Sequence, residues 1–464
     1  MRRKLLCVML VVVLVASAVM MLACNNNNGN NANFVVPEGG YDGSAVTIKF
    51  YHTMGQNLRD VLDLYIPEFN KIYPNITIEH EQVGSYDDVR TQVSTEINVG
   101  AQPNIAYCYP DHVALYNVAG AVVQLDNLIA STEEGIGLSE AQIADFVPGY
   151  YNEGKQFGDG FMYTMPLSKS SEVLYYNKDF FAANDLSVPT TWDEMEAVCK
   201  IIKEEIDPDC IPLGYDSEAN WFITMCEQYG SPYTSAEEDS DHFLFNNDTN
   251  KPFVKRFREW FQKGYVTTQE LYGAYTSELF TELSQEADAQ RCYMCIGSTG
   301  GAAHQVPSPD VGQTGFEVGI ATIPQVNANN PKVISQGPSL CIFGKENPQE
   351  VIASWLFVKF LTTNVDFQAE FSYESGYAPV IQSVTSNADY AAYLNSSDVK
   401  AMATKVCLQQ ANAYYTSPAF NGSSMARDEV GNLMQKCLSG EASDVDAFIN
   451  QAFIDAVNEC EYNS

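Results

Sequence analysis

The sequence predicts an α/β protein with mainly parallel sheets and two lobes. Short apolar runs alternate along the chain with amphipathic helical stripes, which is the pattern of strands connected through helices. The chain beyond residue 23 has 441 residues (464 less the first 23), which is too long for one core of ordinary size and fits two. No internal repeat is visible that would indicate a solenoid.

Local patterns place the first elements. Residues 46–51 alternate between apolar and polar side chains and predict a half-buried strand. Apolar residues then recur at spacings of three and four from Leu58 to Ile72, which predicts a helix, with Pro67 as the site of a kink. A second strand is expected from Ile76, directly after a Pro-Asn pair.

Later elements follow the same alternation. Thr191-Trp-Asp-Glu194 is a capping box and predicts the start of a helix. Residues 318–323 and 340–343 predict strands, and the stripe over 353–361 predicts a helix between the second of these strands and the C-terminal part. A last helix is expected from Val445, with Ser443 as its cap.

The N-terminus predicts export and lipidation. Three basic residues precede an apolar run that ends at Ala23, Cys24 follows, and the next nine residues are mostly asparagine. We expect residues 1–23 to be a signal peptide, Cys24 to carry acyl chains such as palmitate, and residues 24–42 to form a flexible tether at the outer face of the membrane. The alternative is an uncleaved membrane anchor, because 19 apolar residues are close to the roughly 20 that span a bilayer.

The charge balance limits the possible partners. The formal net charge is −34, and the predicted leader holds three basic and no acidic residues, so the rest of the chain carries −37. Such a surface repels nucleic acid and anionic membranes, and its ordinary role is solubility. No nucleic-acid partner is expected, and an anionic ligand would need a local positive group.

Cysteine and histidine patterns do not predict a metal site. Ten cysteines follow Cys24; the even number is compatible with disulfides, whereas the positions of several of them on apolar faces of predicted elements fit buried free thiols equally well. Cys292 and Cys295 lie in a predicted strand, where residues three apart face opposite sides, and no second such pair exists. The five histidines lack metal-ligand spacing. We expect no metal and no cofactor.

Four stretches, in order along nearly the whole chain, carry a family resemblance. They are residues 50–75, residues 100–105, residues 166–181 with the run Val173-Leu-Tyr-Tyr-Asn-Lys-Asp179, and Gly337-Pro-Ser-Leu340 together with Ser375-Gly-Tyr-Ala-Pro-Val380. With them, the chain resembles the extracellular solute-binding proteins of bacterial ABC importers, the family that includes maltose-binding protein. The resemblance implies a two-lobed periplasmic-binding-protein-like fold of type II, with a hinge and an inter-lobe ligand cleft.

The resemblance also implies boundaries and a mode of action. One lobe would comprise residues 43–168 and 315–371, and the other residues 173–314 and 377–464, with hinges at 167–173, 312–318 and 372–377. A monomer would close on a small-molecule solute and deliver it to the permease subunits of the membrane, with no catalytic residues.

Within that family the pattern is most similar to the glycerol-3-phosphate binders. The resemblance covers the regions of Tyr86, 146–151 and Ser170, the stretch 376–380, and a late arginine. One family position departs, because the glutamate that would contact the glycerol hydroxyls falls on Pro110, with Asp111 beside it as a substitute. The ligand-binding residues that the resemblance implies are Tyr86, Asp111, Ser170, Trp221, Ser298 or Thr299, Gly337, Tyr377 and Arg427.

The residue types leave the ligand open. Arg427 and serine hydroxyls suit a phosphate, whereas Tyr86, Trp221, Tyr377 and an Asp111 acceptor suit a neutral sugar. Each also has a structural interpretation: an exposed helix arginine, a core tryptophan, a tyrosine that anchors a turn. We expect a carbohydrate or a glycerol-3-phosphate-like solute, with a neutral oligosaccharide slightly favoured.

Two other classes of protein are alternatives. A secreted glycan or phosphoester hydrolase would need two convergent carboxylates or a nucleophile elbow, and no compact motif of either kind occurs. A surface polysaccharide-binding or sensing protein without a transporter would have a similar fold, and the sequence does not separate it from a transport protein.

Overall fold

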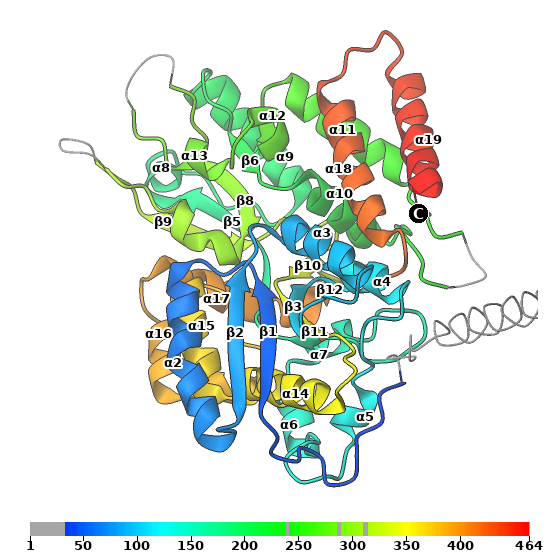
Figure 1. The fold of residues 1–464 in the computed structure, drawn as a ribbon. Helices are drawn as coiled ribbons and strands as arrows, with labels where there is room; N and C mark the ends of the chain where they lie inside the picture. The colour runs from blue at the N-terminus through cyan, green and yellow to red at the C-terminus, as the bar shows by residue number, and fades with distance from the viewer. Residues whose placement is uncertain (1–32, 238–240, 285–288, 310–313, 464) are drawn as a thin grey trace, which may run out of the picture.

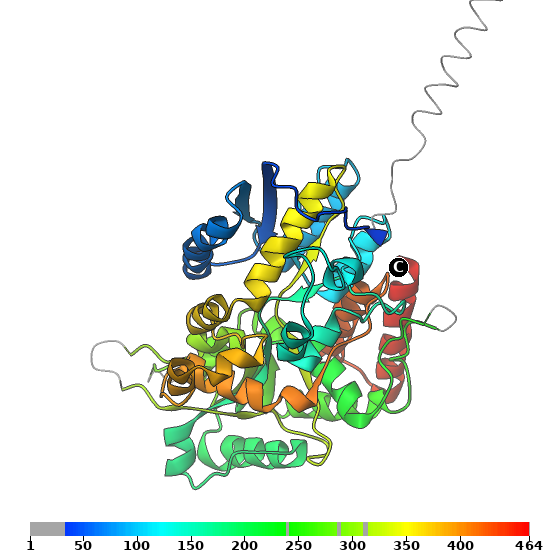
Figure 2. The ribbon, with the colours of Figure 1, turned by 90° about the horizontal axis from the view of Figure 1, so that it is seen from below.

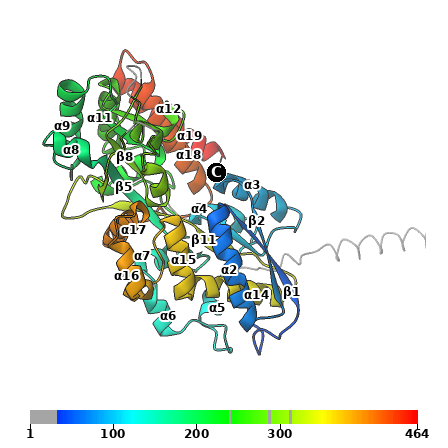
Figure 3. The same ribbon diagram turned by 90° about the vertical axis from the view of Figure 1, so that its left-hand side faces the viewer.

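The computed structural model describes residues 33–237, 241–284, 289–309 and 314–463. Within them the chain forms two lobes, each built around its own sheet and hydrophobic core (Figures 1 and 3). The predicted signal peptide and the predicted lipidation site at Cys24 lie outside the described residues. No helix of the described chain is long and apolar enough to cross a bilayer.

The sheet of the first lobe has five strands in the order β2-β1-β3-β11-β4. β1 runs parallel to β2 and β3, as alternation of strands with helices predicts, while β11 is antiparallel to β3 and β4. The strands are β1 (Val46–His52), β2 (Ile76–Gln82), β3 (Ile105–Cys108), β4 (Met165–Pro166) and β11 (Ser339–Ile342).

Helices cover both faces of this sheet. α2 (Gln56–Ile72) and α14 (Pro348–Thr363) enclose an aromatic core in which the ring centroid of Phe69 is 5.1 Å from that of Phe357. Figure 2 shows α14 in yellow alongside the blue β1. On the other face α3 (Tyr86–Ile97) and α4 (Pro110–Asn117) pack over Tyr51.

The sheet of the second lobe has seven strands, six of them in the order β12-β10-β5-β8-β6-β7, with β9 paired to β5. β6 is parallel to β7 and β8, and β10 is parallel to β12, whereas β5 is antiparallel to β8, β9 and β10. The strands are β5 (Ser170–Asn177), β6 (Leu213–Tyr215), β7 (Val266–Thr268), β8 (Met294–Ser298), β9 (Val318–Thr322), β10 (Val333–Gln336) and β12 (Tyr414–Tyr415).

Five longer helices enclose the core of the second lobe. They are α9 (Trp192–Ile201), α10 (Glu218–Tyr229), α11 (Asn250–Gln262), α18 (Ser423–Ser439) and α19 (Val445–Asn463).

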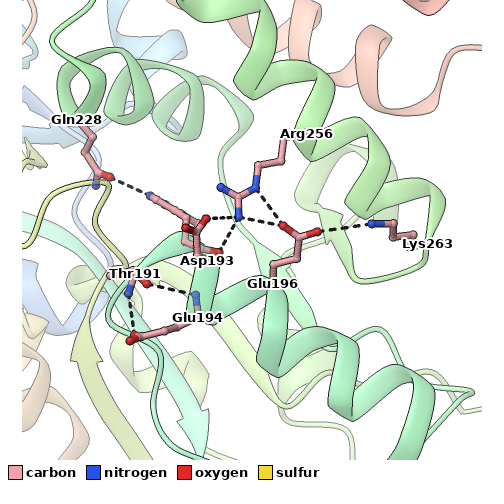
Figure 4. Close-up of polar contacts among 8 residues, drawn as sticks. Thr191, Asp193, Glu194, Glu196, Gln228, Arg256 and Lys263 are labelled. Atoms are coloured by element: carbon pink, nitrogen blue, oxygen red, sulfur yellow. Dashed lines mark hydrogen bonds and ion pairs between the residues drawn. The ribbon is translucent and has the colours of Figure 1, made fainter.

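The start of α9 confirms the predicted capping box. Thr191 accepts from the backbone N–H of Glu194, whose side chain accepts from the backbone of Thr191 (Figure 4). In the next turn, Arg256 of α11 pairs with Glu196 at 2.9 Å and Asp193 at 2.7 Å, which joins the two helices. The capping box therefore determines where α9 begins, and the ion pairs of Arg256 hold α11 against it.

Shorter helices connect these elements. The α-helices are α5 (Asp126–Ile129), α6 (Glu140–Asp145), α7 (Pro148–Glu153), α8 (Lys178–Ala183), α12 (Gln269–Tyr272), α13 (Ser277–Phe280), α15 (Val365–Ser375), α16 (Ala388–Leu394) and α17 (Val399–Gln409). A π-helical turn, η2 (Ile202–Ile206), extends α9, and 3₁₀ turns form η3 (Thr299–Gln305), η4 (Gln382–Ser386) and η5 (Ala411–Ala413).

The chain crosses between the lobes at points that differ from the predicted boundaries. Residues 315–336 were assigned to the first lobe, but β9 and β10 belong to the second sheet, so the crossing falls at Gly337-Pro338 instead of 312–318. Residues 377–394 were assigned to the second lobe, but Val380, Val384 and Tyr390 lie in the first core. In both cases long-range pairing and packing decide the lobe, and the local sequence pattern does not contain that information.

The predicted tether is shorter than its expected range of 24–42. Phe34, Val36 and Tyr41 pack against the core of the first lobe. The side chain of Asn127 donates to the backbone oxygen of Phe34 at 2.9 Å, and Glu133 accepts from a backbone N–H in the same segment. This segment is therefore part of the first lobe.

Candidate functional site

A cavity of about 240 Å³ lies between the two lobes. The first lobe contributes residues of α3, α4 and the end of α7, and the second contributes α10, β10, residues 416–418 and α18. Figure 1 shows α3 and α4 beside α18 where the lobes meet. A molecule bound here would contact both lobes at once.

The lobes are already in contact beside this cavity. Arg90 of α3 pairs with Asp87 of the same helix at 3.2 Å and also donates to the hydroxyl of Ser424 in α18. Because the second bond spans the lobes, it joins them at the cavity edge. The charged residues that line the cavity are Asp87, Arg90, Asp111, Glu153, Arg427 and Asp428, together with the titratable His112.

Arg427 is held in place by a buried polar network. It donates to the side-chain oxygen of Asn220, and Asn220 exchanges two hydrogen bonds with the amide of Gln336, at 2.8 and 3.1 Å. Glu172 lies behind them, 2% exposed, and accepts from the Tyr215 hydroxyl at 2.7 Å. Burial raises the pKa of Glu172 to about 7, although its hydrogen bonds and the Arg427 charge each lower it.

Tyr86 reaches the cavity from the first turn of α3. A capping box between Ser85 and Asp88 fixes the start of the helix and thereby places this ring. The ring centroid of Tyr86 lies 4.7 Å from that of Tyr109, which also lines the cavity. Burial raises the pKa of Tyr86 well above its ordinary value, and it raises the pKa of Tyr377, where a hydrogen bond with Tyr86 offsets part of the effect.

Three of the predicted ligand-binding residues come together at the cavity. Tyr86 and Asp111 line it from the first lobe, and Arg427 lines it from the second. They lie 25 residues or more apart in sequence, so only the fold brings them together. Arg427 is half-buried, which differs from the exposed helix arginine that the sequence left open.

Five other predicted residues lie near the crossing segments, residues 167–169 and 337–338, where the chain passes from one sheet to the other. None of the five lines the cavity. Ser170 pairs with Gln336 in the ladder between β5 and β10, Ser298 caps η3, and Thr299 accepts from the backbone N–H of Ser171 at 3.3 Å. Gly337 and Tyr377 complete this group: Gly337 packs on the backbone of residues 168–170, and the ring of Tyr377 covers Gly300.

Trp221 lies in the core of the second lobe and not at the cavity. It is fully buried, its ring is stacked at 4.8 Å on Tyr215, and its centroid is 4.1 Å from that of Phe257. The structure therefore favours the interpretation of Trp221 as a core residue. The aromatic residues that line the cavity are instead Tyr86, Tyr109 and Tyr233, together with the imidazole of His112.

Several lining residues were not predicted from the sequence. His112 directly follows Asp111, and Glu153 lies just beyond the 146–151 segment, so both were adjacent to recognised positions. Arg90 could have been found from the helical spacing, since it lies one turn after Tyr86. Tyr233 and Gln336 had no local signal, because long-range packing and strand pairing place them.

Glu153 connects the cavity to the crossing segments. Its carboxylate is paired with the ammonium group of Lys169, and both side chains are almost completely buried. Lys169 also donates to the Gly337 carbonyl at 3.1 Å and to the Ser339 hydroxyl at 3.0 Å. Its backbone exchanges two hydrogen bonds with Ala378, so one lysine joins three distant stretches of the chain. Within the described residues, no group of three or more His, Cys, Asp or Glu is arranged to hold a metal ion.

Two sheets, two cores and a polar cavity between them define a two-lobed solute-binding protein. The model of the bacterial extracellular solute-binding protein family matches residues 65–397, and the chain belongs to this family. The family resemblance and the fold class predicted from the sequence are thereby confirmed.

Curated relatives cover most of the chain. The sn-glycerol-3-phosphate-binding periplasmic protein UgpB of Agrobacterium fabrum is 26% identical over 348 residues, which are 73% of this chain and 74% of that protein. UgpB of Rhizobium meliloti is 25% identical over 354 residues, 73% of this chain and 76% of that protein. Both relatives are named as proteins that bind sn-glycerol-3-phosphate.

Solved structures share the fold at low identity. UgpB from Mycobacterium tuberculosis in complex with glycerophosphocholine matches with a TM-score of 0.71 and 17% identity, covering 90% of this chain and 98% of that one. The cyclic alpha-maltosyl-1,6-maltose binding protein from Arthrobacter globiformis matches with a TM-score of 0.69 and 19% identity, covering 91% of this chain and 100% of that one.

Proposed function

We propose that this chain captures a small hydroxyl-rich solute, a carbohydrate or a glycerol-3-phosphate-like molecule, between its lobes and delivers it unchanged to an ABC permease. The observation that carries the proposal is the inter-lobe cavity, to which Tyr86 and Asp111 contribute from one lobe and Arg427 from the other. A solute that touches both lobes stabilises the closed arrangement over the open one, which is the physical basis of capture.

The cavity suits a small ligand. Its volume of about 240 Å³ lies just below the range of about 300–1,000 Å³ that is usual for ligand pockets, and its tyrosine rings, carboxylates and arginines suit hydroxyl groups. Relatives bind glycerol-3-phosphate, and neighbours of similar fold bind glycerophosphocholine or maltose-based sugars.

Charge favours a neutral sugar over a phosphate. Arg90 is paired with Asp87, Arg427 is bonded to Asn220, and the lining carboxylates outnumber the two arginines. A phosphate would have to recruit an arginine from its present partner, whereas sugar hydroxyls could bond to carboxylates as they stand.

Membrane attachment and partners belong to the same proposal. Cys24 would carry the lipid anchor, residues 24–32 would form the remaining tether, and the closed monomer would dock on permease subunits. The second candidate is a surface polysaccharide-binding or sensing protein without transport, which would have the same cavity. Metabolic labelling with a radioactive or alkyne-bearing palmitate, with Cys24→Ala as control, tests the anchor: label on the wild type alone supports it.

Calorimetry tests the ligand. The full chain purified in detergent would be titrated with D-glucose, maltose, sn-glycerol-3-phosphate and glycerophosphocholine. Asp111→Asn should weaken sugar binding, and Arg427→Met should abolish binding of a phosphate ester; Arg59→Met, on α2 away from the cavity, is the matched control. Unchanged binding of a phosphate ester by Arg427→Met would refute the phosphate reading, and binding of no solute by the wild type would refute the proposal.

A further inference from the structure

Three buried polar atoms at the cavity have no hydrogen-bond partner among the described residues. They are the Nδ1 atom of His112, the hydroxyl of Tyr233 and the hydroxyl of Ser335. All three residues line the cavity, and they are 4%, 5% and 6% exposed. A buried polar atom without a partner costs free energy, and proteins rarely contain one without a reason.

These atoms come from both lobes. His112 lies in α4 of the first lobe, and its ring meets that of Tyr109 edge-on at 5.6 Å. Ser335 lies in β10 of the second lobe, opposite Ser171 of β5, and Tyr233 follows α10. A molecule that bonds to all three would therefore join the lobes, as a captured solute must.

Their chemistry fits neutral hydroxyl groups. The serine and tyrosine hydroxyls each donate and accept, and the imidazole of His112 is neutral because burial lowers its pKa. Burial has the largest effect on this pKa; Asp111 and Asp87 raise it, whereas Arg90 and Arg427 lower it further. A phosphate oxygen only accepts and an ammonium group only donates, whereas a solute hydroxyl does both.

We infer that His112, Tyr233 and Ser335 contact the solute directly and select it by its hydroxyl groups. The inference rests on the proposed function and adds three specificity-determining residues to the cavity. None of them belongs to the set that the sequence resemblance implied. In the solute-free protein their unsatisfied atoms disfavour the enclosed cavity, and the solute removes that cost when it bonds to them.

The structure supplies matched controls. Tyr116 and Thr224 also carry buried hydroxyls without a partner in the described chain, and neither lines the cavity. Tyr116→Phe and Thr224→Val remove the same kind of atom as Tyr233→Phe and Ser335→Ala do. Any effect of losing an unpartnered hydroxyl as such will appear in all four variants, whereas an effect on solute contact will appear only in the last two.

The test is calorimetry of the full chain with D-glucose, maltose and sn-glycerol-3-phosphate, combined with thermal unfolding in the absence of solute. For the solute that the wild type binds most tightly, Tyr233→Phe and Ser335→Ala should each weaken binding about three- to tenfold, as loss of one hydrogen bond does. Neither substitution should lower the unfolding temperature of the solute-free chain. His112→Gln, which keeps a polar group at that position, should bind more tightly than His112→Phe.

The outcomes separate the two proposals. Wild-type affinity in both Tyr233→Phe and Ser335→Ala would overturn this inference and leave the proposed function standing. An equal loss of affinity in the Tyr116→Phe and Thr224→Val controls would overturn it as well, since the effect would then not come from the cavity. Failure of the wild-type chain to bind any of the three solutes or glycerophosphocholine would refute the proposed function, and this inference with it.

Discussion

At the scale of single residues, the backbone conformation and the close packing of Gly337 disfavour any side chain at this position. Its φ of +101° lies where side chains are disfavoured, and a Cβ would stand 2.6 Å from the carbonyl oxygen of Ser168. We expect Gly337→Ala to destabilise the chain by about 2–4 kcal/mol in urea unfolding. Gly100→Ala is the control, because Gly100 has a φ of +69° with open space around it and should lose only about 1 kcal/mol. Equal losses would show that the close approach to Ser168 is unimportant.

Glu172 should make stability depend on pH. Its folded-state pKa of about 7 exceeds the ordinary 4.5, so between these values the folded state binds more protons than the unfolded one. The contribution of Glu172 to stability is therefore fully present below about pH 4.5 and is lost as the pH rises through 7. Glu172→Gln cannot ionise, and relative to wild type it should gain about 3 kcal/mol between pH 4.5 and 8.

Urea unfolding of both proteins at pH 4.5 and pH 8 measures this difference. Glu81→Gln, on an exposed position of β2, serves as the control for loss of one negative charge. A Glu172→Gln effect of the same size at both pH values would contradict the predicted titration of the buried carboxyl group.

At the scale of single residues, the sequence identified part of the candidate site. Tyr86, Asp111 and Arg427 were predicted from the family resemblance and do line the cavity. Trp221 was expected near the cleft, but Tyr215 and Phe257 enclose it in the core, and no local pattern distinguishes an aromatic residue that stacks on a ligand from one that stacks on other rings.

Among elements, the crossing segments depend on one buried ion pair. Lys169→Met would leave Glu153 as an uncompensated buried charge, and such a loss costs about 3–5 kcal/mol. Replacing both partners by apolar residues, as Lys169→Met with Glu153→Leu, should recover most of that loss. The midpoint of urea unfolding measures each variant.

An exposed pair is the natural comparison. Lys178 and Glu317 also form an ion pair, but their side chains are 50% and 63% exposed, so Lys178→Met should leave the midpoint unchanged. If Lys169→Met proved as harmless as Lys178→Met, the buried pair would not hold the crossing segments together.

At the scale of elements, the sequence predicted correctly the features that interactions between neighbouring residues determine. The alternation at 46–51 gave β1, and the capping box at Thr191 gave the start of α9. The predicted cap at Ser443 was displaced by one residue, because Asp444 accepts the backbone N–H of Ala447 instead. β9 and β10 were assigned to the wrong lobe, because their pairing partners in β5 lie between 141 and 166 residues away and the sequence of a strand does not identify its partner.

Over the whole molecule, all ten described cysteines are free and buried. Burial raises the pKa of Cys210 and Cys437 to about 12, which keeps the thiols protonated and unreactive. We expect a thiol reagent to react with none of these ten cysteines in the native chain and with all ten after unfolding in urea without reductant. Fewer than ten after unfolding would reveal disulfides, the alternative that the even cysteine count left open.

The docking of Phe34, Val36 and Tyr41 on the first lobe has a mechanical consequence. A chain held by a lipid at Cys24 would be attached to the membrane through that lobe alone, by the short tether of residues 24–32. The tether would then limit how far the first lobe can move from the bilayer, and opening and closing would appear as a movement of the second lobe relative to the first. A partner protein in the membrane would find the first lobe tethered close to it and would detect bound solute through the position of the second lobe.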